Sequence, residues 1–119
     1  MSDMVSWIIE LKLKEGQLDT FKALMTEMVT ATQENEAGTL NYEWYLSEDE
    51  QSCHVFERYS NSESVMIHLM TFGAKYAEKF LETVDVTKLT LYGNPNEIVR
   101  AALANFEITS LGLIGGFAR

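Results

Sequence analysis

The chain has 119 residues, a length typical of one domain and too short for two independent hydrophobic cores. It carries 18 acidic and 9 basic residues, a formal net charge of -9. That charge repels nucleic acid and anionic membrane surfaces, so we expect neither as a partner. A single cysteine, Cys53, excludes an intrachain disulfide. Residues 1–16 show no secretory pattern and no apolar stretch approaches a membrane span, which predicts a cytoplasmic protein.

The predicted elements begin with a half-buried strand over residues 5–13, where apolar side chains alternate along most of the segment. Over residues 17–36 the apolar period becomes helical, and Gly38 supplies a residue that can end this helix. Two further alternating stretches, residues 39–46 and 52–59, are joined by a short polar loop. This pattern predicts a β-hairpin.

A second helix is expected to begin at the serine- and asparagine-rich residues 60–63 and to pause at Gly73. A shorter helical piece over residues 75–82 leads to a fourth strand, residues 85–92, which is rich in β-branched side chains. The order is strand, helix, strand, strand, helix, strand. It predicts an α+β fold of the ferredoxin-like βαββαβ kind.

Residues 94–119 are expected to form a C-terminal helix and an apolar tail beyond the ferredoxin-like unit of residues 1–93. Asn94 and Pro95 suit the cap and first turn of that helix. The 12 apolar and glycine-rich residues from Ile108 onward should not stay in water, so they should cover a sheet edge or cross to a partner subunit. Of these two arrangements, we favour exchange across a dimer.

The predicted sheet carries both helices on one side and leaves its other face open. Both alternating sets of strand residues contain apolar side chains, such as Ile8 and Phe56 on one face and Trp7 and Val55 on the other. An open apolar face requires a partner. We therefore expect a homodimer in which two sheets pack together as a dimeric α/β barrel.

A series of features occurs in a defined order along the chain. They are Glu15-Gly16 followed by Phe21, Gly38 with Tyr42, Glu57-Arg58-Tyr59, His68, Thr71 and Phe80. In this order and spacing, residues 7–92 resemble the antibiotic biosynthesis monooxygenase family, which includes small quinol monooxygenase-like proteins with the dimeric α/β-barrel fold.

The resemblance implies insertion of oxygen into a small electron-rich aromatic molecule, such as a quinol, with no flavin, haem or metal cofactor. That reaction needs a base for the phenol, donors for the oxyanion, and an apolar cavity that excludes water. Many members have a second histidine where this chain has Gly73. Relatives that degrade haem use an asparagine, tryptophan and histidine set. Here the tryptophan position is His68 and the haem-ligand position falls near Glu78, which argues against haem degradation.

Two residues are candidate catalytic groups. His68 titrates near neutrality in principle and suits acid–base chemistry, although a helix-flank histidine can also be structural. Glu57, on the same strand face as Val55 and Tyr59, could orient His68 or a substrate hydroxyl, or form a structural ion pair. Two histidines in the whole chain argue against a structural zinc site.

Aromatic side chains are the candidate lining of a pocket for a flat aromatic ligand. Such stripes also build cores and dimer interfaces, the interpretation we prefer for Trp44. The predicted substrate-binding residues are Trp7, Tyr42, Tyr45, Tyr59, Phe72 and Tyr92.

The sequence leaves the function open between distinct classes. The first hypothesis is a cofactor-independent monooxygenase, for which oxygen uptake should be lost in His68→Ala. The alternative is a non-catalytic small-molecule-binding dimer of the same fold, which the glycine at position 73 favours. A purely structural dimer module is the third.

Overall fold

The computed structural model describes residues 3–119 and confirms the α+β fold class. The elements in chain order are β1 (Val5–Leu13), α1 (Leu18–Asn35), β2 (Thr39–Leu46), β3 (Ser52–Tyr59), α2 (Ser62–Lys75), α3 (Ala77–Leu81), β4 (Val84–Tyr92), α4 (Glu97–Ala102) and β5 (Ile108–Leu111). The predicted bounds of β1, β2 and β3 agree with the structure to the residue, because turn-forming polar residues flank each of these strands.

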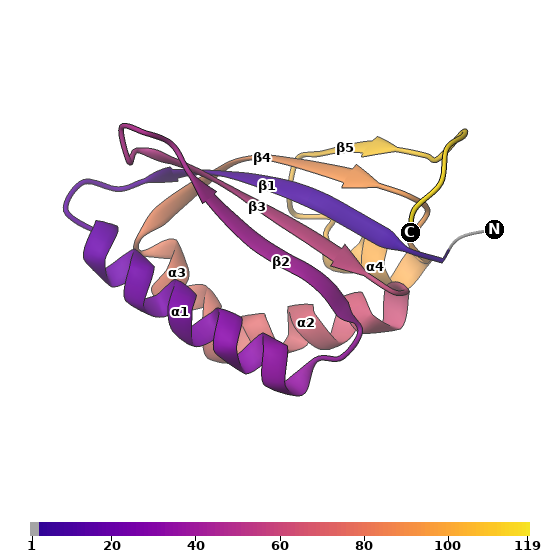
Figure 1. Ribbon diagram of the computed structural model, residues 1–119, viewed down its shortest axis with the longest axis horizontal. Coiled ribbons are helices and arrows are strands. Elements are labelled where there is room, and N and C mark those ends of the chain that lie inside the picture. The colour runs from indigo at the N-terminus through magenta and orange to yellow at the C-terminus, as the bar shows by residue number, and fades with distance from the viewer. Residues whose placement is uncertain (1–2) are drawn as a thin grey trace.

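The five strands form one sheet in the order β2-β3-β1-β4-β5. The strand β1 lies at the centre and pairs antiparallel with both β3 and β4, which is the arrangement of a ferredoxin-like unit. Figure 1 shows α1, α2 and α3 beneath the sheet and no element above its other face. One face of the sheet is therefore covered by helices and the other is open, as the predicted βαββαβ order implies.

The core lies between the sheet and the helices and consists of two clusters. One joins β1 and β3 to α2 and α4 through Trp7, Tyr59, Val65, Val99 and Leu103. The other joins α1 and α3 to the opposite end of the sheet; its buried members are Leu11, Phe21, Leu24, Met28, Cys53, Val55, Phe80 and Val84. The C-terminal helix α4 thus packs on the core of its own chain.

Two helix boundaries differ from the prediction. The helix α2 runs through Gly73 to Lys75, and the amide of Tyr76 still bonds the carbonyl oxygen of Phe72 at 2.9 Å. Glycine weakens a helix interior without ending it, so the predicted pause at Gly73 was wrong. The cap of α4 is Asn96, whose side chain accepts the amide of Val99 at 3.0 Å, rather than Asn94.

The C-terminal segment covers a sheet edge. Residues Ile108–Leu111 form β5, a fifth strand beyond the predicted βαββαβ order, and pair in parallel with β4. The apolar side chains that follow lie in the open: Ile114 is fully exposed and Phe117 is 82% exposed. The tail therefore pairs with one edge strand of the sheet through β5. Its last apolar residues are not covered by any described residue of this chain.

Candidate active site

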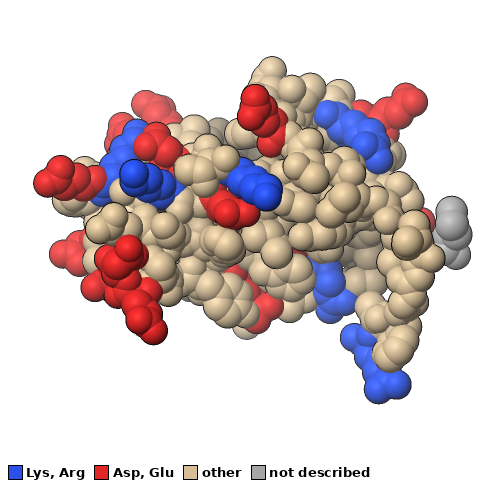
Figure 2. All heavy atoms as spheres, turned by 90° about the horizontal axis from the view of Figure 1, so that it is seen from above, with Lys and Arg blue, Asp and Glu red and all other residues tan. Residues whose placement is uncertain are grey.

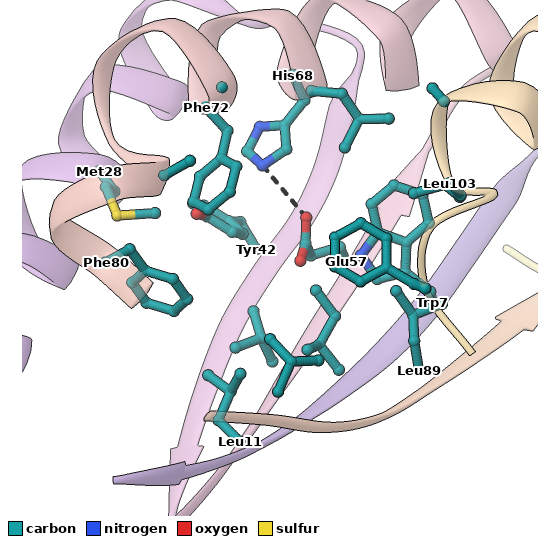
Figure 3. Close-up of a pocket in the computed structure, with 18 of the residues that line it drawn as sticks. Trp7, Leu11, Met28, Tyr42, Glu57, His68, Phe72, Phe80, Leu89 and Leu103 are labelled. Atoms are coloured by element: carbon teal, nitrogen blue, oxygen red, sulfur yellow. Dashed lines mark ion pairs between the residues drawn. The ribbon is translucent and has the colours of Figure 1, made fainter. Parts of the chain in front are cut away.

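His68 is held inside the molecule by the first turns of α2. The side chain of the cap residue Asn61 accepts the amide of Ser64 at 2.8 Å, which fixes where the helix begins. Val65 and His68 are three positions apart and so share the face of α2 that packs on the sheet, where both are buried. His68 therefore points at the sheet, as Figure 3 shows.

Two carboxylates flank the imidazole ring. The Nδ1 atom of His68 lies 2.8 Å from Oε1 of Glu36, and its Nε2 atom lies 3.3 Å from Oε1 of Glu57. The hydroxyl of Tyr59 donates a hydrogen bond to the same Oε1 atom of Glu57. All four side chains are buried. They come from α2, from the residue after α1 and from β3, so the tertiary fold alone brings them together.

The charge of His68 follows from this arrangement. Burial by itself lowers the pKa of His68, but the hydrogen bonds and negative charges of Glu57 and Glu36 outweigh burial and raise the pKa above its ordinary value. The imidazolium form is therefore favoured. A cation between two carboxylates compensates buried charges that would otherwise be very costly.

Two tyrosines pack against the imidazole. The ring of Tyr42 meets it edge-on at 5.0 Å between centroids, and the ring of Tyr59 lies 5.6 Å away. Burial, reinforced by the charge of Glu57, raises the pKa of both phenols well above the usual range. Both hydroxyls stay protonated, so Tyr59 is a donor to Glu57 and does not compete with it as a base.

An apolar cavity of about 440 Å³ opens beside this cluster, between the sheet and the helices. Among the residues that line it are Trp7, Met28, Tyr42, Trp44, Glu57, His68, Phe72, Phe80, Leu89 and Leu103. In Figure 3 the carboxylate of Glu57 bridges His68 and the cavity, with one oxygen toward the imidazole and the other toward the open space. The polar end of the cavity is thus formed by Glu57 and His68.

The structure separates the sequence-predicted site residues into three groups. Trp7, Tyr42, Glu57, His68 and Phe72 all line the cavity. Tyr59 stands behind Glu57 and holds it by a hydrogen bond without lining the cavity itself.

Tyr45 and Tyr92 lie away from the cavity. Tyr45 is 57% exposed and lines a separate hollow of about 370 Å³ on the open face of the sheet. Tyr92 is also exposed and pairs in register with Ser6. Neither side chain belongs to the lining of the cavity beside His68.

Glu36 is the site residue that the sequence analysis missed. It lies 32 positions from His68, directly after α1, and no local motif marks it. The one available signal is electrostatic, because an acidic side chain beside a helix C-terminus meets the negative end of the helix dipole. A buried cation partner such as His68 explains why this position tolerates glutamate.

The described residues offer neither a metal site nor an activated thiol. Within residues 3–119, no group of three or more histidine, cysteine, aspartate or glutamate side chains is arranged to hold a metal ion. Cys53 is buried, and burial raises the pKa of its thiol to about 11, so the thiol is not an activated nucleophile. No helix in this part of the chain has the length and apolar character required to cross a bilayer.

Fold and site together define a small ferredoxin-like α+β protein with a buried acid–base cluster at one end of an apolar cavity. The sequence model of the antibiotic biosynthesis monooxygenase family matches residues 4–84, and the chain belongs to this family. No curated protein matches the sequence.

Solved structures share the fold at low sequence identity. MupZ from Pseudomonas fluorescens superposes with a TM-score of 0.85 at 22% identity, covering 99% of this chain and 96% of MupZ. Rv0793 from Mycobacterium tuberculosis gives a TM-score of 0.64 at 23% identity, covering 79% of this chain and 97% of that one. A protein from Bacteroides thetaiotaomicron, named as a candidate antibiotic biosynthesis monooxygenase, gives 0.67 at 18% identity over 73% and 85%. At these identities the likeness shows the fold alone.

Proposed function

We propose that this protein is a cofactor-independent monooxygenase that oxidises a small electron-rich aromatic molecule, such as a quinol, and that it works as a homodimer. The observation that carries the proposal is the buried Glu36–His68–Glu57 cluster, which faces an otherwise apolar cavity of about 440 Å³. Family membership supports the same reaction class.

Glu57 is the proposed base. Its hydrogen bond from Tyr59 and its contact with His68 both fall on Oε1. The hydrogen bond from Tyr59 and the ion pair with His68 leave Oε2 of Glu57 unused among residues 3–119, and Figure 3 shows this oxygen toward the cavity. A phenol hydroxyl in the cavity would find this oxygen free to accept its proton. Deprotonation makes the ring a better electron donor, which is what reaction with molecular oxygen requires.

His68 is the proposed acid. Its pKa is raised, so it enters the reaction as an imidazolium that stabilises the phenolate. The phenolate passes one electron to O₂, which gives a phenoxyl radical and superoxide. These two combine through a new C–O bond at a ring carbon and form a peroxide anion. Protonated Glu57 returns the phenol proton to the peroxide anion, which gives a hydroperoxide. Glu57 then takes the proton from the same ring carbon, the electrons of that C–H bond form a C=O bond, and the O–O bond breaks. The outer oxygen leaves as hydroxide and takes a proton from His68 to become water.

The balance of this reaction needs no external reductant. A hydroquinone and one O₂ give a hydroxyquinone and one water, and all four electrons come from the substrate. The protein contributes the base, the acid and a cavity that excludes bulk water. Trp7, Tyr42 and Phe72 are the proposed contacts for the flat ring, because each lines the cavity beside Glu57 and His68.

The test is oxygen consumption with a panel of hydroquinones and catechols in chelator-treated buffer. We expect saturable uptake by the wild-type protein and a loss of about 10²- to 10⁴-fold in kcat/KM for His68→Ala and for Glu57→Gln. Glu34→Gln and Ile67→Ala are matched controls, because both residues are exposed, lie outside the cavity and lie away from the open face of the sheet.

Either of two results would overturn the proposal. Uptake that never exceeds autoxidation across the panel, together with ligand-induced thermal stabilisation, would support the non-catalytic binding dimer instead. Uptake that falls equally in Ile67→Ala and His68→Ala would remove the cavity from the mechanism.

A further inference from the structure

The cavity beside Glu57 is larger than a single small ring requires. Its volume is about 440 Å³. An apolar cavity of about 150 Å³ is enough to hold benzene, so one quinol ring would leave more than half of this cavity unfilled. Unfilled apolar space forfeits packing contacts, and small-molecule pockets enclose most of the surface of their ligand. The volume therefore indicates a ligand with a second part beyond its ring.

This second part has room on one side of Glu57. The lining comes from four neighbouring strands in the order β2-β3-β1-β4, and Glu57 lies on β3, the second of them. Ile9 of β1 and Leu89 of β4 continue the lining beyond it. Figure 3 shows Leu89 and Leu103 together on one side of Glu57. Strands are spaced about 4.8 Å apart, so the cavity continues for about 10 Å past the proposed base.

The exposure of the lining residues locates the mouth of the cavity. Glu57 is 3% exposed and His68 is also buried, whereas Met70 is 69% exposed and lines the same cavity. Leu81 and Phe106 are further lining residues that are exposed. They come from α2, α3 and the segment after α4, so the cavity reaches solvent between these elements. The acid–base pair is thus at the closed end and an apolar rim is at the open end.

The path between Glu57 and this mouth is apolar. Val86 and Leu89 of β4 line it, together with Leu103 at the end of α4. Within the described part of the chain, the cavity lining contains no lysine, arginine, serine, threonine, asparagine or glutamine. A charged or strongly polar group held on this path would lose its water without gaining a partner. The second part of the ligand is therefore uncharged and apolar.

We infer that the substrate is an amphiphilic phenol, in which a hydroquinone ring at Glu57 carries a hydrocarbon chain directed toward Met70 and Phe106. An extended chain advances about 1.2 Å per bond, because three bonds span about 3.5 Å. About eight carbons therefore cover the distance of about 10 Å to the mouth. This inference deepens the proposed function and rests on it for the position of the ring. The chain is what it adds.

The test measures the binding of 2-alkylhydroquinones, with chains from methyl to decyl, by calorimetry under nitrogen, where oxidation cannot occur. Burying each methylene group should raise the affinity about three- to fourfold. We expect one ligand per chain and at least about 100-fold tighter binding of the octyl than of the methyl compound. The gain per methylene should fall beyond octyl, where the chain enters water.

The variant Met70→Glu tests whether the chain leaves by this mouth. It places a carboxylate on the rim beside the chain, at an exposed position that the core does not depend on. The ratio of octyl to methyl affinity should fall at least about fivefold. Ile67→Glu is the matched control, because Ile67 is exposed on the same helix and does not line the cavity. The wild-type series decides the matter alone if Met70→Glu folds poorly.

Equal affinity for the methyl and octyl compounds would overturn the inference. A ratio that falls as much in Ile67→Glu as in Met70→Glu would do so too. Binding that depends on chain length, without oxygen uptake in air, would contradict the proposed reaction and leave this class of ligand in place. Oxygen uptake with an affinity that does not depend on chain length would do the reverse.

Discussion

At the scale of single residues, the site depends on one histidine placed between two carboxylates. His68 contacts Glu36 through Nδ1 at 2.8 Å and Glu57 through Nε2 at 3.3 Å. The shorter contact is to the carboxylate that does not line the cavity, so Glu36 orients and charges the ring while Glu57 stays available to a ligand. We regard Glu36 as a positioning residue, which acts through His68.

This arrangement predicts a specific dependence of stability on pH. Because the pKa of His68 is raised in the folded protein, its contribution is complete below the unfolded-state pKa of about 6.5 and is lost as pH rises through the higher folded-state pKa. We expect the free energy of unfolding to fall across that window, with a slope of up to about 1.4 kcal/mol per pH unit. Urea denaturation at a series of pH values measures it.

The variant Glu36→Gln isolates the cause of this slope. It removes one negative charge from Nδ1 of His68 and keeps an acceptor there, so the pKa of His68 should fall and the slope should weaken. Glu34→Gln removes an equal charge from an exposed position two residues away and should leave the slope unchanged. A wild-type protein whose stability rises over this window would contradict the assignment of charge to His68.

Much of the candidate site could be predicted from residue types and strand alternation. His68 and Glu57 stood out by chemistry, and Trp7 and Tyr42 by their position on the inward faces of strands. Alternation also accounts for Tyr45, which lies next to the inward-facing Trp44 and so points to the opposite face. Glu36 could not be predicted, because it meets His68 only where the fold brings the residue after α1 beside α2.

At the scale of secondary-structure elements, the connection between α1 and β2 positions Glu36. Gly38 lies in this connection, and a Cβ atom there would stand 2.0 Å from Oγ and 2.6 Å from Cβ of Ser64 in the first turn of α2. The carbonyl oxygen of Gly38 also accepts the amide of Ser60 at 2.9 Å. The contact therefore joins the segment carrying Glu36 to the helix carrying His68.

We predict that Gly38→Ala destabilises the protein by about 1–3 kcal/mol, because α2 must shift to accommodate the added methyl group. Gly73→Ala is the matched control, since a Cβ there meets nothing within 4 Å and the residue lies inside α2. Replacing a helix-interior glycine should stabilise the protein by about 0.5–1 kcal/mol. Thermal and urea unfolding of both variants measure the difference. Equal effects of the same sign would show that Gly38 is not sterically required.

The sequence predicted elements best where periodicity and turn chemistry agree. The strands β1 to β3 have polar flanks and clear alternation, and their predicted bounds hold. The strand β5 was missed because Ile108–Leu111 has no alternating pattern of its own and becomes a strand only by pairing with β4. Gly73 misled the prediction because packing of its neighbours outweighs the weak helix propensity of glycine.

At the scale of the whole molecule, the open face of the sheet is an apolar surface that no element of the described chain covers. Ile8, Tyr45, Leu46 and Phe56 line a hollow of about 370 Å³ on it, and Tyr45 is more than half exposed. Figure 2 shows charged side chains gathered toward one end of this face and reaching its middle, with an uncharged area beyond them. A 119-residue chain buries about two-thirds of its unfolded surface, so pairing two such faces would add considerable stability.

We therefore predict that the protein sedimenting at tens of micromolar is a dimer that uses this face. Tyr45→Glu would place one carboxylate from each subunit in the apolar interface and should weaken dimerisation by at least about 100-fold. Ile67→Glu is the matched control, because Ile67 is an exposed apolar residue on α2, on the helical side of the molecule. Analytical ultracentrifugation of the three proteins decides the matter. A monomeric wild type would contradict the prediction, and a control that dissociates as readily as Tyr45→Glu would place the subunit contact elsewhere.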